Sequence, residues 1–279
     1  MNNFLSGLYI VSTPIGNLDD ITLRALNVLK NSDKILCEDT RRSIKLLNHY
    51  NINNKLISHH KFNEKKTASI ILENIKNGEV VSIISDAGTP TISDPGLVLI
   101  NECIKNNIKI FPIPGVSAVT TAISVSGLSD QYFFYGFLPK KQTAIEKELK
   151  KLKEHKFNLV FFIPAIKINF YMKLFKKFMK KREVFIAREM TKIHETFYRF
   201  NLDKFSGFKE NLKGELTVVI SGNNENFTNN TVVDTKKLNI EIKQYLKKYS
   251  VKDVVNLFSQ KNNLSKKKIY DICLKIKKI

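Results

Sequence analysis

Residues 85–96 hold the densest set of groups in this chain that could do chemistry. Their sequence, SDAGTPTISDPG, contains two Asp, two Gly and two Pro beside several hydroxyl groups. Glycine lets a ligand approach the main chain, and proline stiffens a loop. The stretch follows a β-branched run and precedes a helix-like run, so we expect it at the carboxyl end of a strand, where open α/β sheets bind ligands. It could be an ordinary connection between a strand and a helix, but it is longer than such a connection needs.

Two other stretches repeat this chemistry. Residues 12–17 read STPIGN and residues 112–118 read PIPGVSA, and each follows an apolar run. Small residues at the start of a helix leave free N–H groups that can face a ligand. Strand-like and helix-like runs alternate from residue 8 to about residue 127, which predicts a parallel sheet with the three loops on one edge. No GxGxxG follows the first run, so the dinucleotide-binding fingerprint is absent.

A fourth stretch places four charges directly after the strand-like run of residues 34–37. It reads EDTRRS and spans residues 38–43. Carboxylates can act as general bases, and the guanidinium fork of Arg matches phosphate oxygens. We interpret this stretch as part of a site, although helix capping alone would explain Asp39 or Thr40.

The positive charge lies almost entirely in the second half of the chain. The net charge is +20; residues 1–136 carry 13 Lys and Arg against 12 Asp and Glu, and residues 137–279 carry 33 against 14. This asymmetry indicates a polyanionic partner such as a nucleic acid. A bias of the genome towards Lys is the alternative, but it should have raised both halves.

The elements predict an α/β protein with three parts. An N-terminal domain with the parallel sheet spans residues 1–127, and a second α/β domain with a mixed sheet spans residues 128–225. An Asn-rich linker lies near its end, at residues 223–230. The tail, residues 226–279, is basic and helical; it resembles a helix-turn-helix, or it is a small solvated helical appendage.

Several classes are disfavoured by composition. The chain has 279 residues, of which 43% are hydrophobic, but no apolar stretch of about 18 residues that could span a membrane. Its N-terminus lacks the features of a signal peptide. Cys37, Cys103 and Cys273 are widely spaced, which fits free thiols in a reducing cytoplasm. Neither they nor the histidines have metal-ligand spacing, so we expect no metal.

These stretches together resemble the tetrapyrrole-methylase-like class of S-adenosylmethionine methyltransferases, and within it the bacterial small-subunit ribosomal RNA 2′-O-methyltransferase I family. That family shows LYIVxTPIGNLxDIT, EDTR, SDAGTPxISDPG and PGxxA. This chain carries the four motifs at residues 8–22, 38–41, 85–96 and 114–118. The family motifs ARExTK and KGE are matched at residues 187–192 and 213–215. The resemblance covers nearly the whole chain, including the basic tail.

The resemblance implies two α/β domains with S-adenosylmethionine in the cleft between them, usually within a homodimer in the cytoplasm. It implies methylation of a cytidine ribose 2′-hydroxyl in 16S ribosomal RNA, as free small-subunit RNA or within the 30S subunit. By position, the residues that would line the cofactor are Pro14, Gly16, Asp86, Ala87, Gly88, Thr89, Val116, Ser117 and Ala118.

The candidate catalytic and substrate-binding residues come from the same motifs. The candidate catalytic carboxylates are Glu38, Asp39, Asp94 and Glu189, and the sequence does not choose a base among them. The candidate phosphate-binding residues are Arg41, Arg42, Arg188 and Lys192. For Arg188 and Glu189, an internal ion pair is an alternative to a role in the site.

Two stretches depart from the family pattern. Residues 162–167 read FIPAIK where the family usually has a Tyr-Glu-Ser-Pro-His-Arg-like segment, so this wall of the site differs. Residues 60–64 read HKFNE where the family has His-x-His-Asn-Glu, so we assign no histidine pair to catalysis. Two other functions stay open: a tetrapyrrole methylase, which would not need a basic tail, and a non-catalytic nucleic-acid-binding protein, which would not need the 85–96 loop.

Overall fold

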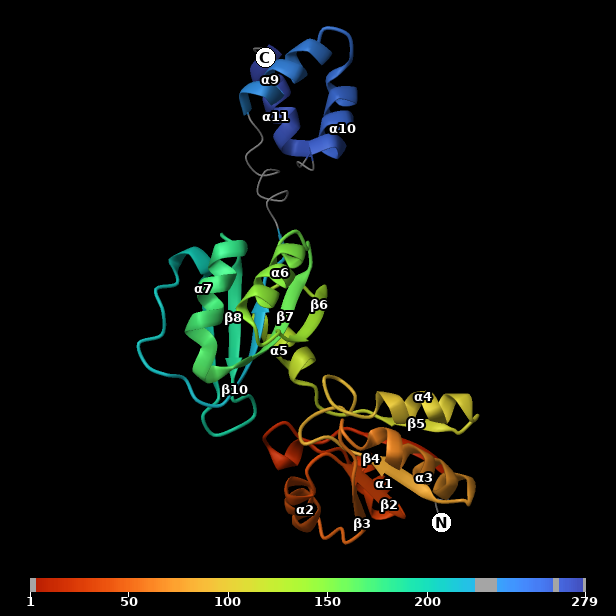
Figure 1. The fold of residues 1–279 in the computed structure, drawn as a ribbon. Helices are drawn as coiled ribbons and strands as arrows, with labels where there is room; N and C mark the ends of the chain where they lie inside the picture. The colour runs from red at the N-terminus through yellow and green to blue at the C-terminus, as the bar shows by residue number, and fades with distance from the viewer. Residues whose placement is uncertain (1–3, 224–234, 263–265, 278–279) are drawn as a thin grey trace. The chain divides into compact units, whose positions relative to one another are not determined.

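The computed structural model describes residues 4–223, 235–262 and 266–277. The chain divides into two compact units, residues 1–222 and 223–279 (Figure 1). The first unit carries two β-sheets, and the second carries the helices of the basic tail. Apart from Asn223, the expected linker lies outside the described residues.

The first sheet is parallel, as the alternation of strands and helices predicts. Its strands run in the order β3-β2-β4-β1-β5. The strands are β1 (Gly7–Val11), β2 (Lys34–Cys37), β3 (Lys55–Ser58), β4 (Val80–Ile83) and β5 (Ile110–Ile113). The helices that follow the first four strands are α1 (Leu23–Lys30), α2 (Thr40–His49), α3 (Glu64–Lys76) and α4 (Leu97–Lys105).

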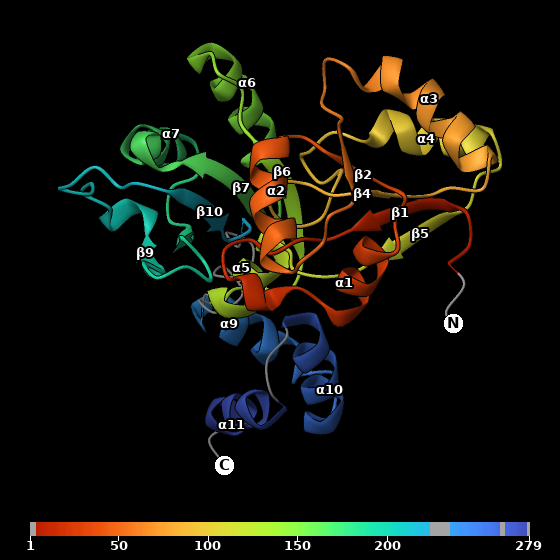
Figure 2. The same cartoon turned by 90° about the horizontal axis from the view of Figure 1, so that it is seen from below.

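Helices cover both faces of the first sheet, because successive side chains of a strand point to opposite faces. On one face, Tyr9 of β1 packs with Leu29 of α1 and Leu47 of α2. On the other, Leu8 of β1 packs with residues of α3 and α4, which lie together in Figure 2. The sheet is therefore buried on both sides, and its loops at the carboxyl ends of the strands remain for function.

The second sheet is mixed, in the order β6-β7-β10-β8-β9, with β6 and β7 parallel and the remaining pairs antiparallel. Its strands are β6 (Tyr132–Phe137), β7 (Asn158–Pro164), β8 (Glu183–Arg188), β9 (Thr196–Asn201) and β10 (Glu215–Ile220). Helices α6 (Gln142–Leu152) and α7 (Ile168–Phe178) pack on one face around Phe161. The short 3-10 helices are η1 (Leu18–Asp20), η2 (Ala165–Lys167) and η3 (Leu202–Lys204).

Helix α5 (Ala118–Ser126) packs on the other face of the second sheet, although it directly follows the first sheet in the chain. Val119 and Ala122 lie in one apolar cluster with Phe185 and Val219. This helix therefore links the two sheets. The division of the chain at residue 127 stays a prediction. Helix α5 lies before residue 127 in the chain but packs against the sheet that follows it.

The tail forms helices α9 (Thr235–Tyr245), α10 (Val251–Asn262) and α11 (Lys266–Lys277) around a core of its own. Ile242, Phe258 and Ile269 are fully buried there. Ser250 caps the start of α10 as expected, since its hydroxyl accepts a 3.3 Å bond from the N–H of Asp253. In the part of the chain that the structure describes, no helix is long and apolar enough to cross a membrane.

Candidate functional site

The three glycine- and proline-rich loops meet at the carboxyl edge of the first sheet. Thr13 and Gly88 exchange both backbone hydrogen bonds, at 2.9 and 3.0 Å. The hydroxyl groups of Ser12 and Thr89 lie 2.9 Å apart, and that of Thr89 donates to the carbonyl of Val116 at 3.4 Å. These contacts follow from the strand order, because β4, β1 and β5 are neighbours and end on the same edge.

The backbone of the 85–96 loop is strained. Thr91 has φ 71° and Ser93 has φ 72°, in the left-handed region that favours glycine. For a β-branched residue such as Thr this is a genuine outlier, and each such residue costs about 1–3 kcal/mol. Strain of this kind persists where the surrounding structure imposes it, most often at binding sites. This strain indicates that the loop has a binding role in addition to connecting β4 to α4.

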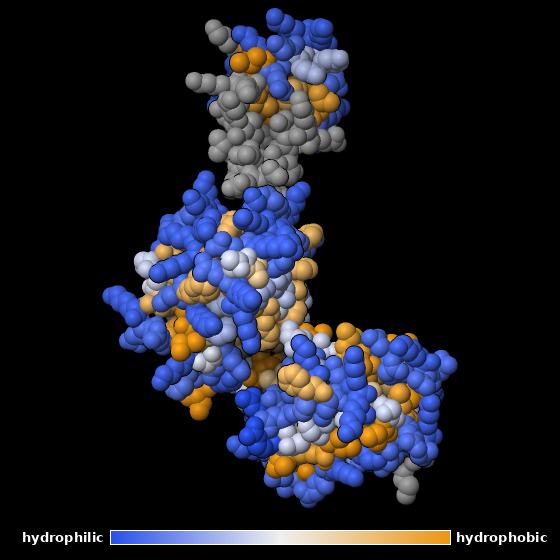
Figure 3. Space-filling model, viewed as in Figure 1, coloured by the Kyte–Doolittle hydropathy of each residue, from blue (hydrophilic) through white to orange (hydrophobic). Residues whose placement is uncertain are grey.

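A cavity of about 350 Å³ lies between this edge of the first sheet and the second sheet. The first-sheet side is formed by residues 86–89 and 92–94, together with Ile15, Glu38 and Arg42. Residues 117–119, at the start of α5, form another wall. Phe137 and residues 162–164 and 214–217, from β6, β7 and β10 and the residues at their ends, close the far side. In Figure 3, hydrophobic side chains lie within the hollow between the parts that carry the two sheets.

Six of the nine residues expected to line the cofactor border this cavity. They are Asp86, Ala87, Gly88, Thr89, Ser117 and Ala118. Pro14, Gly16 and Val116 do not border it. At Gly16, a Cβ atom would lie 2.6 Å from both Thr191 Oγ1 and Lys192 Cγ, so this glycine permits close contact between the two halves of the unit.

Asp94 borders the cavity with a perturbed carboxyl group. Burial, and after it the nearby charges of Glu38 and Asp86, raise its pKa to about 6, against the opposing effect of a hydrogen bond from Ser85. Glu38 itself is exposed. A carboxylate with a pKa closer to neutrality is a stronger base than an ordinary one, so Asp94 is suited to accept a proton.

Asp39 is bound to its own neighbour. Arg41 donates to its two carboxylate oxygens at 3.0 and 2.8 Å, and this side-chain hydrogen bond, followed by one from the Arg41 backbone, lowers the pKa of Asp39 to about 2. Asp39 is also the N-terminal cap of α2. Asp39 therefore caps helix α2, which is the alternative that the sequence offered for this residue.

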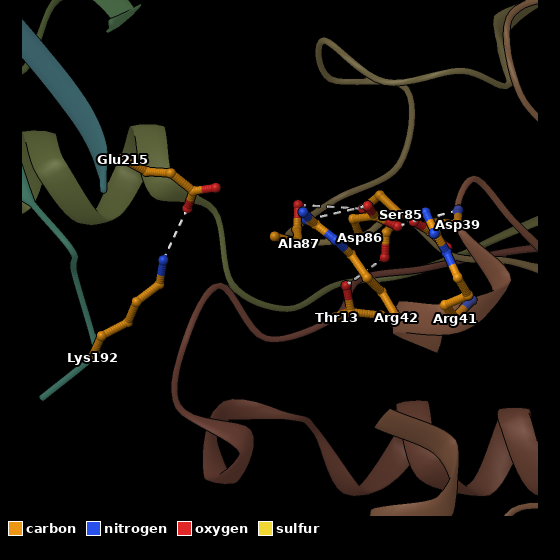
Figure 4. A network of polar contacts seen from close by, with 9 residues as sticks. All are labelled: Thr13, Asp39, Arg41, Arg42, Ser85, Asp86, Ala87, Lys192 and Glu215. Carbon is orange, nitrogen blue, oxygen red and sulfur yellow. Dashed lines mark hydrogen bonds and ion pairs between the residues drawn. The ribbon is translucent and has the colours of Figure 1, made fainter. Parts of the chain in front are cut away.

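Arg42 lies at the mouth of the cavity and pairs with Asp86, with 3.3 Å between Nη1 and Oδ2. Its side chain is two-thirds exposed, at 67%. Figure 4 shows this pair beside Ser85 and Ala87, with the pair of Lys192 and Glu215 on the opposite side. A second, open pocket adjoins the first and is bordered by residues 38–42 and 60–62, which include two Arg, a Lys and a His. This pocket therefore offers the cationic groups of Arg41, Arg42 and Lys61, beside the carboxylates of Glu38, Asp39 and Asp86.

Known proteins match the chain over this whole region. Residues 7–206 match the tetrapyrrole (corrin/porphyrin) methylase family. Ribosomal RNA small subunit methyltransferase I of Rickettsia prowazekii is 43% identical over 280 residues, which cover 98% of each chain. The chain belongs to the ribosomal RNA small subunit methyltransferase I family. It is a methyltransferase.

Two further comparisons bear on the methyltransferase. The relative of the same name from Thermotoga maritima is 45% identical over 77% of this chain and 98% of its own length. The solved uroporphyrin-III C-methyltransferase of Thermus thermophilus, complexed with S-adenosylhomocysteine, has a TM-score of 0.55 and 13% identity over 77% of this chain and 97% of that one. This likeness shows the shared fold.

The stretch at residues 187–192 makes ion pairs and hydrogen bonds inside the methyltransferase and does not border its cavity. Lys192 Nζ lies 3.1 Å from Glu189 Oε1 and 3.0 Å from Glu215 Oε2. Burial alone would raise the pKa of Glu189. Hydrogen bonds from the Glu215 backbone N–H and from Lys192 outweigh burial, so the pKa of Glu189 is lowered. At Gly214 a Cβ atom would lie 2.4 Å from that carboxylate. Glu189 therefore forms an internal ion pair with Lys192, whereas the alternative offered by the sequence was a pair of Glu189 with Arg188.

Arg188 also lies away from the cavity. Its Nε donates to the carbonyl of Lys213 at 2.8 Å. The sequence motifs at residues 187–192 and 213–215 thus pack against each other, which their separation in the chain does not reveal.

The apolar wall of the cavity is what reasoning from sequence missed. Phe137, Phe162 and Leu216 border the cavity, and none was expected there. One signal pointed to it: the departure from the family pattern at residues 162–167 begins on this wall, at residues 162–164. At these three positions the wall is formed by Phe, Ile and Pro.

Proposed function

We propose that this methyltransferase transfers the methyl group of S-adenosylmethionine to the ribose 2′-hydroxyl of a cytidine in 16S ribosomal RNA. The observation that carries the proposal is the match to a relative of that name over 98% of both chains. The ribose and the cytidine come from the resemblance of the loop motifs. The basic second half of the chain supports an RNA substrate.

The cavity fits the cofactor in size and chemistry. Its volume of about 350 Å³ lies in the range of small-molecule sites. The cofactor's carboxylate suits the start of α5 at Ser117 and Ala118, because the Ser117 side chain makes no capping bond and the helix dipole favours a negative charge there. The bound structure of the Thermus thermophilus neighbour, with S-adenosylhomocysteine, supports a cofactor of this class.

Bound S-adenosylmethionine supplies an activated methyl group on a sulfonium, and its sulfur leaves as a neutral thioether. We assign to Asp94 the removal of the 2′-hydroxyl proton as the oxygen–carbon bond forms. Its raised pKa brings the carboxylate closer to the operating pH, which favours general-base catalysis. Glu38 and Asp86 tune that pKa through their charge. The walls of the cavity exclude water and align the reacting groups.

We assign Arg42 and Arg41 to the RNA backbone. Both side chains are largely exposed, at 67% and 88%, and both border the open pocket beside the cavity. Each already pairs with an aspartate, so phosphate would bind to the guanidinium groups that remain accessible. We also propose that the enzyme is a homodimer, that it acts in the cytoplasm, and that its substrate is the 30S subunit or its RNA.

The test is incubation with labelled S-adenosylmethionine and small ribosomal subunits from cells that lack the protein. The RNA is then digested to nucleosides and analysed by mass spectrometry. Label in 2′-O-methylcytidine supports the proposal. Label in a methylated base, or label only when a tetrapyrrole replaces the subunits, would refute it.

A further inference from the structure

An exposed aromatic ring stands at the mouth of the cavity. Phe137, the last residue of β6, borders the cavity and is 61% exposed. Ile92, from the 85–96 loop, also borders the cavity and is 48% exposed. Large apolar side chains held open to solvent beside a site indicate a surface for a ligand.

The ring of Phe137 is supported from inside the protein. It lies 5.3 Å from the ring of Phe162, centroid to centroid, and Phe162 in turn lies 5.1 Å from Phe134. Phe162 also borders the cavity. A ring that is fixed by other rings and exposed on its remaining surface is a rigid platform, and nucleobases stack on such platforms.

The platform lies next to the proposed base. A Cβ atom on Gly136 would lie 3.0 Å from Ser93 Oγ, so the end of β6 touches the 85–96 loop. Asp94 follows Ser93, and Phe137 follows Gly136. The two segments therefore lie together, and Phe137, Asp94 and Arg42 all border the cavity. One border of the cavity thus offers an apolar ring, a carboxylate and a guanidinium group, which suit the base, the ribose hydroxyl and the phosphate of a nucleotide.

The size of the cavity indicates that the cofactor and the group on this platform bind at different places. A volume of about 350 Å³ is at the lower end of the range for small-molecule sites, so one ligand fills it. The exposed surfaces of Phe137 and Ile92 then remain available to a second group.

We propose that Phe137, backed by Phe162 and flanked by Ile92, stacks on the base of the acceptor nucleotide, which is turned out of its RNA strand into the mouth of the cavity. This inference rests on the proposed function. Turning a base out costs unstacking energy, and the aromatic platform offsets that cost. In this chain the apolar segment at residues 162–164 thus has a role in holding RNA.

The experiment compares F137L, F137Y and wild type in methylation of small subunits from cells that lack the protein. Leu keeps the volume and loses the ring, so kcat/KM for the subunits should fall about 10-fold, while the affinity for S-adenosylmethionine, measured by calorimetry, stays the same. Tyr keeps the ring and should restore the wild-type value. F133L is the matched control, because Phe133 is another exposed ring on β6, at 41%, and does not border the cavity.

The outcomes separate this inference from the proposed function. If wild type labels no small-subunit RNA, the proposed function fails. If wild type labels it and F137L matches wild type, or F133L is equally slow, the platform is wrong. An equal loss of cofactor affinity in F137L would place the ring in the cofactor site and overturn the inference. A change of F137L to a smaller species in sedimentation would overturn it as well, since the occupant of the ring would then be a second copy of the chain.

Discussion

Replacing Asp94 by Asn should slow the enzyme and stabilise its fold. Asn has nearly the shape of Asp but cannot accept the 2′-hydroxyl proton or carry a negative charge. Loss of a general base lowers kcat by about 10²–10⁴-fold. Cofactor affinity should change much less, because the proton is removed in the transition state.

The effect on stability follows from the raised pKa. In the folded protein Asp94 keeps its proton up to about pH 6, whereas its ordinary value is 3.8. Between these two values the folded state binds more protons than the unfolded state, so stability falls as the pH rises through this window. Above about pH 6 the carboxylate is ionised in both states, and the free energy of unfolding is lowered by the full cost of burying its charge.

The magnitude is modest because Asp94 is only partly buried. A shift of this size alone corresponds to about 3 kcal/mol, and solvent screening reduces it to about 1–2 kcal/mol. D94N should therefore gain about 1–2 kcal/mol over wild type at pH 7–8. The gain should shrink as the pH falls from 6 and approach zero below about pH 3, where the wild-type carboxyl is protonated in both states.

Two measurements check this reasoning. Urea unfolding of both proteins from pH 4 to pH 8 gives the difference in stability, and single-turnover rates over the same range give the titration of the base. Wild-type activity should rise with pH through about pH 6. E38Q is the companion variant: it removes a charge that raises the pKa of Asp94, so the rise should move to lower pH.

The reasoning fails if D94N reacts at the wild-type rate at pH 7–8, or if the rise near pH 6 persists in D94N. A D94N protein that is slow and less stable than wild type would mean that Asp94 supports the fold and does not carry a strained charge.

Three other predictions follow from the same geometry. D86A should weaken S-adenosylmethionine binding in calorimetry while circular dichroism shows an intact fold; unchanged affinity would remove Asp86 from the cofactor site. RNA binding should weaken linearly with salt on logarithmic axes, by about 0.7–0.9 per phosphate contact, and deletion of residues 223–279 should reduce that slope if the basic tail binds RNA; a flat salt dependence contradicts a phosphate-based interface. K192M should lower the free energy of unfolding, because it removes the partner of Glu189 and Glu215, while leaving the salt slope of RNA binding unchanged; a reduced slope with normal stability would return Lys192 to the substrate site.

Local chemistry in the sequence was enough to find the loops of the site. The 85–96 loop was recognised because glycine, proline and Asp together are typical of a binding loop after a strand. The alternation of strands and helices predicted the parallel sheet, and a parallel sheet must bring the carboxyl ends of its strands to one edge. The excess of Lys in the second half predicted a polyanionic partner without any structure.

Roles within the site depended on contacts between distant parts of the chain. Asp39 is held by Arg41, only two residues away, which lowers its pKa to about 2. The pKa of Asp94 is raised to about 6 by burial and by Glu38 and Asp86, and Glu38 lies on another loop of the chain. Glu189 was a candidate base until the fold brought Glu215 and Lys192 against it. Electrostatic effects depend on distance and burial in space, and sequence separation determines neither.

The sequence by itself determined the family, the parallel sheet and the edge on which the site lies, because these depend on local patterns of residue type. Only the tertiary structure decided that α5 covers the second sheet and that Phe137 and Phe162 form a wall of the cavity. A strand pattern shows that a side chain points to one face of a sheet, but not what that face meets. What it meets depends on the packing of two sheets that the chain builds far apart in sequence.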